Sequence, residues 1–133
     1  MQFNLTPEQR TLQVKARELA RGRIAERAAE IDRTEQYPWD NIALLKEAGF
    51  FGMTIPAAYG GQGAGYLDAV LVIEEMAKRC GVTGRIVVEA NMGAIGAIMA
   101  YGSEAQKRLA ADLVLSGDKP AICITEPSAG SAA

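Results

Sequence analysis

Apolar residues recur every three or four positions along most of this 133-residue chain, a spacing that is typical of amphipathic helices. A first long helix should begin after an N-cap at Thr6, where Gln9 would close a capping box, and run to about Ile31. Its charged face, which includes Arg17, should be solvated or contact another subunit. The buried face would hold Leu12, Ala16, Leu19, Ala20 and Ile24.

The same spacing, with glycines and capping residues as boundaries, predicts four further helices. Gly49 should cap the second, and a Gly- and Pro-rich loop should follow over residues 52–63. Ser103 and Gln106 form a second capping box ahead of the fifth. These four helices should cover approximately residues 38–48, 66–78, 83–100 and 103–117. The third would bury Leu67, Val70, Leu71, Ile73 and Met76 and expose Glu74, Glu75 and Lys78.

The fourth predicted helix differs from the others because one side of it carries small residues. Such a surface allows either a second helix to pack closely or a flat ligand to lie against it, and both interpretations stay open here. The small residues are Ala90, Gly93, Ala94, Gly96, Ala97 and Ala100.

The chain finishes with a different pattern. The β-branched run over residues 120–125 predicts a short strand, and Pro127 and Gly130 predict a turn directly after it. Backbone N–H groups and the hydroxyls of Thr125 and Ser131 would gather there without bulky neighbours, which suits an anionic or heteroaromatic ligand. The fold class is therefore predicted to be all-α, with one terminal strand and no internal repeat.

Composition narrows the classes of function. The chain is 49% hydrophobic and 23% charged, a balance typical of a globular protein, and its net charge of −2 argues against a nucleic-acid binder. The longest apolar stretch, residues 86–100, contains Glu89 and is too short to span a bilayer, so we expect no membrane association. The N-terminus leads directly into a helix start, so we expect no leader and a cytoplasmic location.

There is no histidine, and the two cysteines are far apart in sequence. These residues predict no metal site and exclude histidine-based acid–base chemistry within this segment. We expect Cys80 and Cys123 to be reduced and to lie in or near the core.

Three motifs in this order, together with their spacing, resemble the N-terminal part of the acyl-CoA dehydrogenase family. They are Leu5-Thr6-x-Glu8-Gln9-Arg10; Gly49-x-x-Gly52-Met53-x-Ile55-Pro56-x-x-Tyr59-Gly60-Gly61; and Tyr101-Gly102-Ser103-Glu104-x-Gln106-Lys107 followed by Thr125-Glu126-Pro127-x-Ala129-Gly130-Ser131. The resemblance covers the whole chain. It implies a helical domain over residues 1–117 and the first strand of a β-barrel domain within residues 118–133. In that family a helical bundle follows the barrel, FAD is bound, and the subunits usually form tetramers.

Residues 122–131 match the segment that lies over the flavin ring in that family. The resemblance implies that Thr125 hydrogen-bonds the isoalloxazine, and that Gly130 and Ser131 lie where the FAD phosphates and the CoA thioester chain pass. Two departures, Ile122 in place of a frequent aromatic residue and Ala132 in place of a usual aspartate, predict an altered flavin pocket. The cofactor-binding residues implied are Ile122, Cys123, Ile124, Thr125, Gly130 and Ser131, and Ser131 would also touch the substrate.

The fourth helix matches the family helix that lines the acyl-chain pocket. Arg85, Val88 and Met92 stand at i, i+3 and i+7, so they would share one face. The two apolar side chains suit a short acyl group, and the guanidinium would grip an anionic end of that group through two hydrogen bonds. The alternative is that Arg85 is simply a solvated arginine near a helix start.

Arg85, Ala132 and the phrase Thr34-Glu35-Gln36-Tyr37-Pro38-Trp39-Asp40-Asn41 resemble one branch of the family most closely, the 3-sulfinopropionyl-CoA desulfinases. These release sulfite from the acyl-CoA and leave propionyl-CoA without net oxidation. The second interpretation is a short-chain acyl-CoA dehydrogenase, whose partner would be an electron-transfer flavoprotein. In the dehydrogenases a glutamate of the C-terminal domain is the base, so no catalytic residue is expected in this chain.

A rival from another class is a non-catalytic helical module that binds a full-length homologue. We expect instead that the chain is part of a longer acyl-CoA enzyme and is inactive alone, because the family builds its site from domains that lie beyond residue 133. The whole enzyme is then expected to be a homotetramer.

Overall fold

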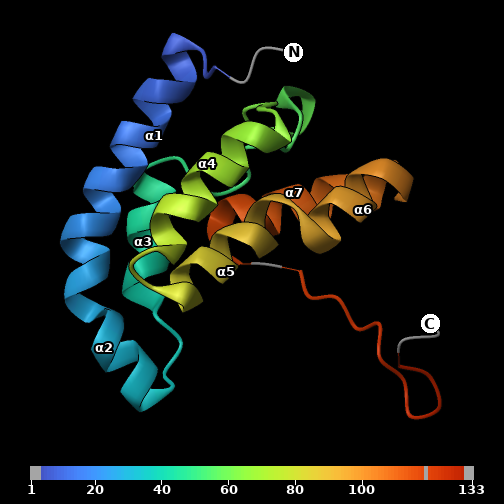
Figure 1. Ribbon diagram of the computed structural model, residues 1–133. Coiled ribbons are helices and arrows are strands. Elements are labelled where there is room, and N and C mark those ends of the chain that lie inside the picture. Colours follow the sequence, from blue (N-terminus) through green and yellow to red (C-terminus); the bar gives the residue numbers. More distant parts are fainter. Residues whose placement is uncertain (1–3, 119, 131–133) are drawn as a thin grey trace.

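The computed structural model describes residues 4–118 and 120–130, and it shows a helical body from which the C-terminal segment projects (Figure 1). The described helices are α1 (Pro7–Leu19), η1 (Ala20–Ile24), α2 (Ala25–Thr34), α3 (Trp39–Glu47), η2 (Ala57–Tyr59), α4 (Tyr66–Ala77), α5 (Gly81–Asn91), α6 (Gly93–Tyr101) and α7 (Glu104–Ser116). The long α1–α2 arm lies along one side of the body, and α6 and α7 lie on the other. The all-α prediction is confirmed.

Both predicted capping boxes form. The Gln9 backbone N–H donates to Thr6 Oγ1 at 3.2 Å, and the Thr6 N–H donates to Gln9 Oε1 at 3.1 Å. Ser103 and Gln106 make the same pair of bonds at the start of α7. Gly49 and Gly117 follow α3 and α7 with φ of +75° and +107°, which glycine adopts without the steric cost of a Cβ.

The second capping box provides a stability test. Ser103→Ala removes the acceptor of the Gln106 N–H, so we expect the free energy of unfolding to fall by about 1 kcal/mol in urea titrations. Ser116→Ala is the control, because its hydroxyl only donates to the Leu113 carbonyl one turn earlier and should matter by less than about 0.5 kcal/mol. Equal losses in the two variants would contradict the assignment of Ser103 as the stabilising cap.

The first predicted helix is not continuous. A π-helical turn, η1, separates α1 from α2, and Gly22 within it has φ −89° and ψ −110°, outside the helical region. A glycine tolerates such a departure, and an inserted residue of this kind changes which side chains face inward. Ala16, Ala20, Ile24 and Ile31 all stay buried across the irregularity, and α2 continues past the predicted end to Thr34.

The fourth predicted helix is likewise two helices, α5 and α6. Met92 has φ −128° and ψ −107°, so the chain leaves the helical conformation there. The buried side chain of Asn91 explains the break, because it bonds the loop after α3: its Nδ2 donates to the Phe50 carbonyl at 2.8 Å, and its Oδ1 accepts the Met53 N–H at 2.7 Å. The Asn91 carbonyl accepts the Thr54 hydroxyl instead of continuing the helical ladder.

α4 packs against both α1 and α5, and three of its side chains differ in burial from the prediction. A Cβ on Gly84 would lie 2.7 Å from the Cβ of Ala77, so the glycine lets α5 approach α4 closely. Glu75, predicted to be exposed, is buried because it forms an ion pair with Arg17 on α1 (Nη2 to Oε1, 2.9 Å). Leu67 and Val70, predicted to be buried, are 52% and 44% exposed, because α4 turns these positions away from both partner helices.

The prediction of a strand over residues 120–125 is wrong, because these described residues have no strand assignment. These residues form no ladder, and one antiparallel bridge, between Glu126 and Ala129, closes the following turn. β-branched residues favour a strand, but a strand needs a partner for its N–H and C=O groups, and the helical body offers none here. Cys80 is buried as predicted, whereas Cys123 is exposed because it lies on this projecting segment.

Candidate functional site

The predicted acyl-binding residues lie along α5 and at its end. The Arg85 side chain is 72% exposed and forms an ion pair with Glu89, one helical turn further on. Val88 is half-buried within the helix. Met92, also half-buried, is the residue at which α5 breaks. Helical spacing therefore places only Arg85 and Val88 on a common face of α5.

Glu89 is a site residue that the sequence reasoning missed. Its side chain is only 10% exposed, its Oε1 faces Arg85, and its Oε2 is buried with no hydrogen-bond partner among the described residues. Buried carboxylates are rarely left in this state, so an unsatisfied oxygen requires an explanation. The sequence feature that could have indicated this residue is a glutamate within an apolar run, four residues after an arginine.

The segment that was predicted to face the flavin begins beside the α5–α6 junction. A Cβ placed on Gly93 would lie 2.9 Å from Glu89 Oε2 and 3.5 Å from Cδ1 of Ile122. Gly93 therefore brings together the buried carboxylate of α5 and the first residue of the predicted cofactor segment. Arg85 pairs with Glu89, Glu89 lies against Gly93, and Ile122 borders the same glycine.

Beyond Ile122 the predicted cofactor residues lie along an open stretch of chain. Cys123, Ile124 and Thr125 are exposed, and the turn after them is closed by two backbone hydrogen bonds between Glu126 and Ala129, at 2.9 and 3.2 Å. A Cβ on Gly130 would meet no heavy atom within 4 Å. Ser131, predicted to touch both cofactor and substrate, and Ala132 lie outside the described residues.

The donor set of this segment fits the edge of a flavin ring. The Thr125 hydroxyl and the backbone N–H groups of residues 122–125 have no hydrogen-bond partner within the described part of the protein. The small residues around the turn leave space for a planar ring, and N–H and O–H donors at its edge are how a protein adjusts the electronics of such a ring. This segment could therefore hold one edge of the cofactor.

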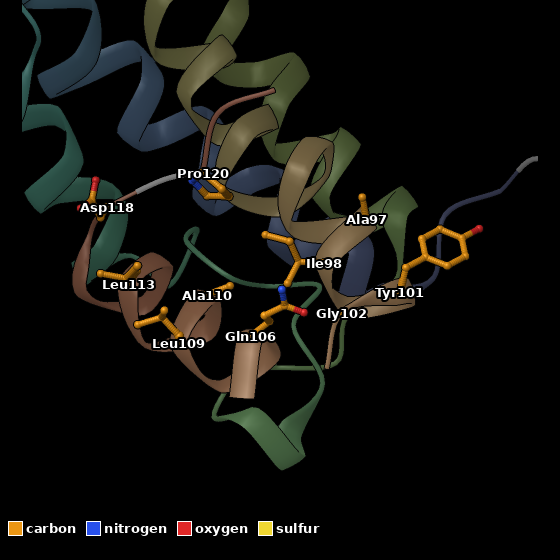
Figure 2. A pocket seen from close by; sticks show the side chains of 10 residues that line it. All are labelled: Ala97, Ile98, Tyr101, Gly102, Gln106, Leu109, Ala110, Leu113, Asp118 and Pro120. Carbon is orange, nitrogen blue, oxygen red and sulfur yellow. The ribbon is translucent and has the colours of Figure 1, made fainter. Parts of the chain in front are cut away.

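A separate apolar pocket of about 550 Å³ lies between α6 and α7, and the predicted site residues do not line it. Figure 2 shows Ile98, Leu109 and Leu113 around the hollow, while Tyr101 points away from it. Tyr101 is 91% exposed and Leu109 is 61% exposed. The pocket was not predicted; its sequence signal is the pair Leu109 and Leu113 at i and i+4 on a helix whose inner face is already occupied by alanines.

Neither a metal-binding cluster nor an isolated apolar helix adds to the site in the described residues. Within residues 4–118 and 120–130, no cluster of three or more histidine, cysteine, aspartate or glutamate residues could hold a metal ion. One segment, Gly81–Tyr101, is by length and composition alone apolar enough to cross a membrane, which corrects the shorter stretch considered above. Half of that segment is buried inside the protein, and core helices pass the same test.

The helical body, from α1 through α7, is the part of the chain that a known family model covers. Residues 6–118 match the family described as "Acyl-CoA dehydrogenase, N-terminal domain", and the chain belongs to this family. The family resemblance drawn from the sequence motifs is thereby confirmed.

Relatives within the family place the chain nearer one branch. It is 65% identical over 131 residues to a 3-sulfinopropanoyl-CoA desulfinase of Advenella mimigardefordensis, covering 98% of this chain and 33% of that protein. It is 36% identical to the short-chain specific acyl-CoA dehydrogenase of Clostridium acetobutylicum, covering 98% of this chain and 35% of that protein. The butyryl-CoA dehydrogenase structure from Megasphaera elsdenii matches with a TM-score of 0.87 at 28% identity, covering 99% of this chain and 36% of that one. The chain thus spans about a third of the length of these relatives.

Proposed function

We propose that this chain is the N-terminal helical domain of an FAD-dependent 3-sulfinopropanoyl-CoA desulfinase. The observation that carries the proposal is Arg85, a largely exposed guanidinium that stands on the same side of α5 and α6 as the predicted cofactor segment. An acyl group that ends in a sulfinate needs such a cation, since a guanidinium binds two anionic oxygens at once. The identity of 65% to a desulfinase, against 36% to a dehydrogenase, supports the same choice.

The proposed reaction needs no external oxidant. The carbon–sulfur bond of the sulfinate breaks, water supplies a hydrogen to the carbon and an oxygen to the sulfur, and propanoyl-CoA and hydrogensulfite result. Within this chain, Arg85 would hold the sulfinate, and Val88 and Met92 would contact the short acyl chain. Ile122, Cys123, Ile124, Thr125 and Gly130, together with Ser131, would hold the flavin edge.

The proposal includes the division of the chain and its assembly. Residues 1–117 would form the helical domain and residues 118–133 the beginning of a barrel domain, in a cytoplasmic homotetramer that binds acyl-CoA and FAD. Residues 120–125 would become a strand once a neighbouring strand pairs with them, which accounts for the lack of ladder pairing in this segment. The 133-residue chain alone would be inactive, because the remaining part of the site belongs to other domains.

A short-chain acyl-CoA dehydrogenase is the second candidate, favoured by the 36% identity to the clostridial enzyme. In that case the α,β-bond of the acyl-CoA is oxidised, and an electron-transfer flavoprotein accepts the electrons. A single assay of the longer protein separates the two: sulfite release from 3-sulfinopropanoyl-CoA supports the desulfinase, and reduction of a dye with butyryl-CoA supports the dehydrogenase. If the longer protein shows neither activity, the non-catalytic module is the function that remains.

The role of Arg85 is tested by Arg85→Gln in the longer protein. We expect kcat/KM for 3-sulfinopropanoyl-CoA to fall by about 10- to 100-fold, because a charge-assisted hydrogen bond is lost, while the dissociation constant of butyryl-CoA, an uncharged short acyl-CoA, changes little. Arg79→Gln, which removes a nearby exposed arginine, should change neither value. An equal weakening of butyryl-CoA binding, or no loss with 3-sulfinopropanoyl-CoA, would contradict the proposed role of Arg85.

A further inference from the structure

We propose that Glu89 is a positioning residue that holds Arg85 ready for the anionic end of the acyl group. This inference rests on the proposed function of Arg85. It assigns a role to the one buried carboxylate beside the candidate site, and it predicts that selectivity for an anionic acyl-CoA depends on an ion pair within α5 as well as on the arginine itself.

Arg85 and Glu89 differ strongly in burial, and this difference is the first observation that supports the proposal. The Glu89 side chain is 10% exposed and the Arg85 side chain is 72% exposed, so the carboxylate lies beneath the guanidinium. An anion that approaches from solvent therefore meets the guanidinium before it meets the carboxylate. Removing the carboxylate from water is costly unless a cation is close, and Arg85 is its ion-pair partner in the described structure.

The geometry of the guanidinium carries the second step. The Arg85 guanidinium approaches Glu89 Oε1 through Nη2, while the side chain as a whole stays largely exposed. A guanidinium presents five donors in a fixed plane, so fixing one nitrogen orients the remaining donors together. An arginine this exposed would otherwise adopt several rotamers, and ordering it would oppose substrate binding.

The surroundings of the second carboxylate oxygen carry the third step. Glu89 Oε2 has no hydrogen-bond partner, and it lies against Gly93, where a Cβ would approach it to 2.9 Å. The carboxylate is therefore held between Arg85 on one side and the start of α6 on the other. Because Ile122 borders the same glycine, the ion pair lies close to the first residue of the predicted cofactor segment.

The order of the Arg85 side chain gives a test on this chain that does not depend on activity. ¹⁵N relaxation of its Nε–Hε group should show an ordered side chain in the wild type and a clearly lower order parameter in Glu89→Gln. Glu74→Gln is the matched control, because it removes an exposed i,i+4 ion pair with Lys78 on α4. An Arg85 side chain that is equally mobile in the wild type and in Glu89→Gln would overturn the inference.

Kinetics of the longer protein give the second test. The quantity measured is the ratio of KM for 3-sulfinopropanoyl-CoA to the dissociation constant of butyryl-CoA, which requires no turnover of the uncharged ligand. We expect Glu89→Gln to raise this ratio about three- to tenfold, the cost of ordering one long side chain, with a smaller change in kcat. In the Arg85→Gln background the same substitution should have no further effect, because there is no arginine left to position.

The outcomes distinguish the inference from the function on which it rests. If Arg85→Gln changes the ratio but Glu89→Gln does not, or changes it equally in both backgrounds, Glu89 is not a positioning residue and the proposed function stands. If Arg85→Gln itself leaves the ratio unchanged, both fall. Glu89→Met is the second variant, should Glu89→Gln fold poorly: an apolar side chain suits the buried position, and the exposed arginine remains solvated.

Discussion

Asn91→Ala should lower the free energy of unfolding by about 3–5 kcal/mol, the largest single effect that we expect in the helical body. The Asn91 side chain is fully buried and makes three hydrogen bonds, to the Phe50 carbonyl (2.8 Å), the Val87 carbonyl (2.9 Å) and the Met53 N–H (2.7 Å). Alanine would leave these backbone groups without a partner in a place that water does not reach. A domain of this size is stable by only about 5–15 kcal/mol, so the loss is a large fraction of the total.

Urea titration followed by circular dichroism measures this effect. Gln62→Ala is the matched control, because Gln62 is also an amide that donates to a backbone carbonyl, that of Gly49 at 2.6 Å, but it is exposed. We expect the control to change the free energy of unfolding by less than about 1 kcal/mol. A loss below that value for Asn91→Ala would mean that Asn91 does not tie the loop after α3 to α5.

The second large effect concerns the ion pair that joins α1 to α4. Arg17 donates from Nε and Nη2 to both oxygens of Glu75, at 3.2 and 2.9 Å, and the carboxylate is 4% exposed. Arg17→Met leaves this buried carboxylate with Lys78 alone, whose Nζ lies 3.4 Å away. Because an unpaired buried charge is costly, the variant should unfold at a clearly lower urea concentration than the wild type.

The same pair predicts how stability depends on pH. The hydrogen bonds from Arg17 lower the pKa of Glu75 below its ordinary value of 4.5, and they outweigh burial, which acts in the opposite direction. The folded state therefore binds this proton less readily than the unfolded state. The contribution of Glu75 to stability is complete above about pH 4.5 and is lost as the pH falls through the folded pKa.

We therefore expect the acid-induced fall in stability to be shallower in Arg17→Met than in the wild type, because the pKa of Glu75 rises toward its unfolded value when Arg17 is gone. Unfolding free energies measured in steps from pH 7 to pH 3 would show this difference. Glu74→Gln removes an exposed partner of Lys78 at 2.9 Å and should leave the curve almost unchanged. A wild-type slope in Arg17→Met would show that other carboxylates determine the acid response.

The local chemistry of several elements was sufficient to predict them. Thr6 with Gln9, and Ser103 with Gln106, start helices because the bonds involved are made within four residues, and no distant partner is needed. The spacing of apolar residues likewise predicted an all-α body and part of its core, including Ala16, Ala20 and Ile24. The motifs were specific enough to identify the family that the match over residues 6–118 then confirmed.

Interactions between distant residues were not predictable in this way. Glu75 resembles any exposed helical glutamate in the sequence, and only the approach of α1 places Arg17, 58 residues earlier, against it. The break at Met92 depends on the loop after α3, because the Met53 N–H donates to the Asn91 side chain and the Thr54 hydroxyl donates to the Asn91 carbonyl. Residues 120–125 have the composition of a strand, but pairing requires a neighbour that the helical body does not supply.

The sequence by itself therefore determined the helical class, the helix starts and the family, because these depend on periodicity and on contacts within a few residues. Tertiary structure alone decided that the fourth helix would be two, that Glu75 would be buried, and that Glu89 would lie beneath Arg85 with an oxygen at Gly93. The physical reason is the same in each case. The state of a polar side chain is set by whether a partner replaces the water it loses, and in these folded helices that partner is placed by packing.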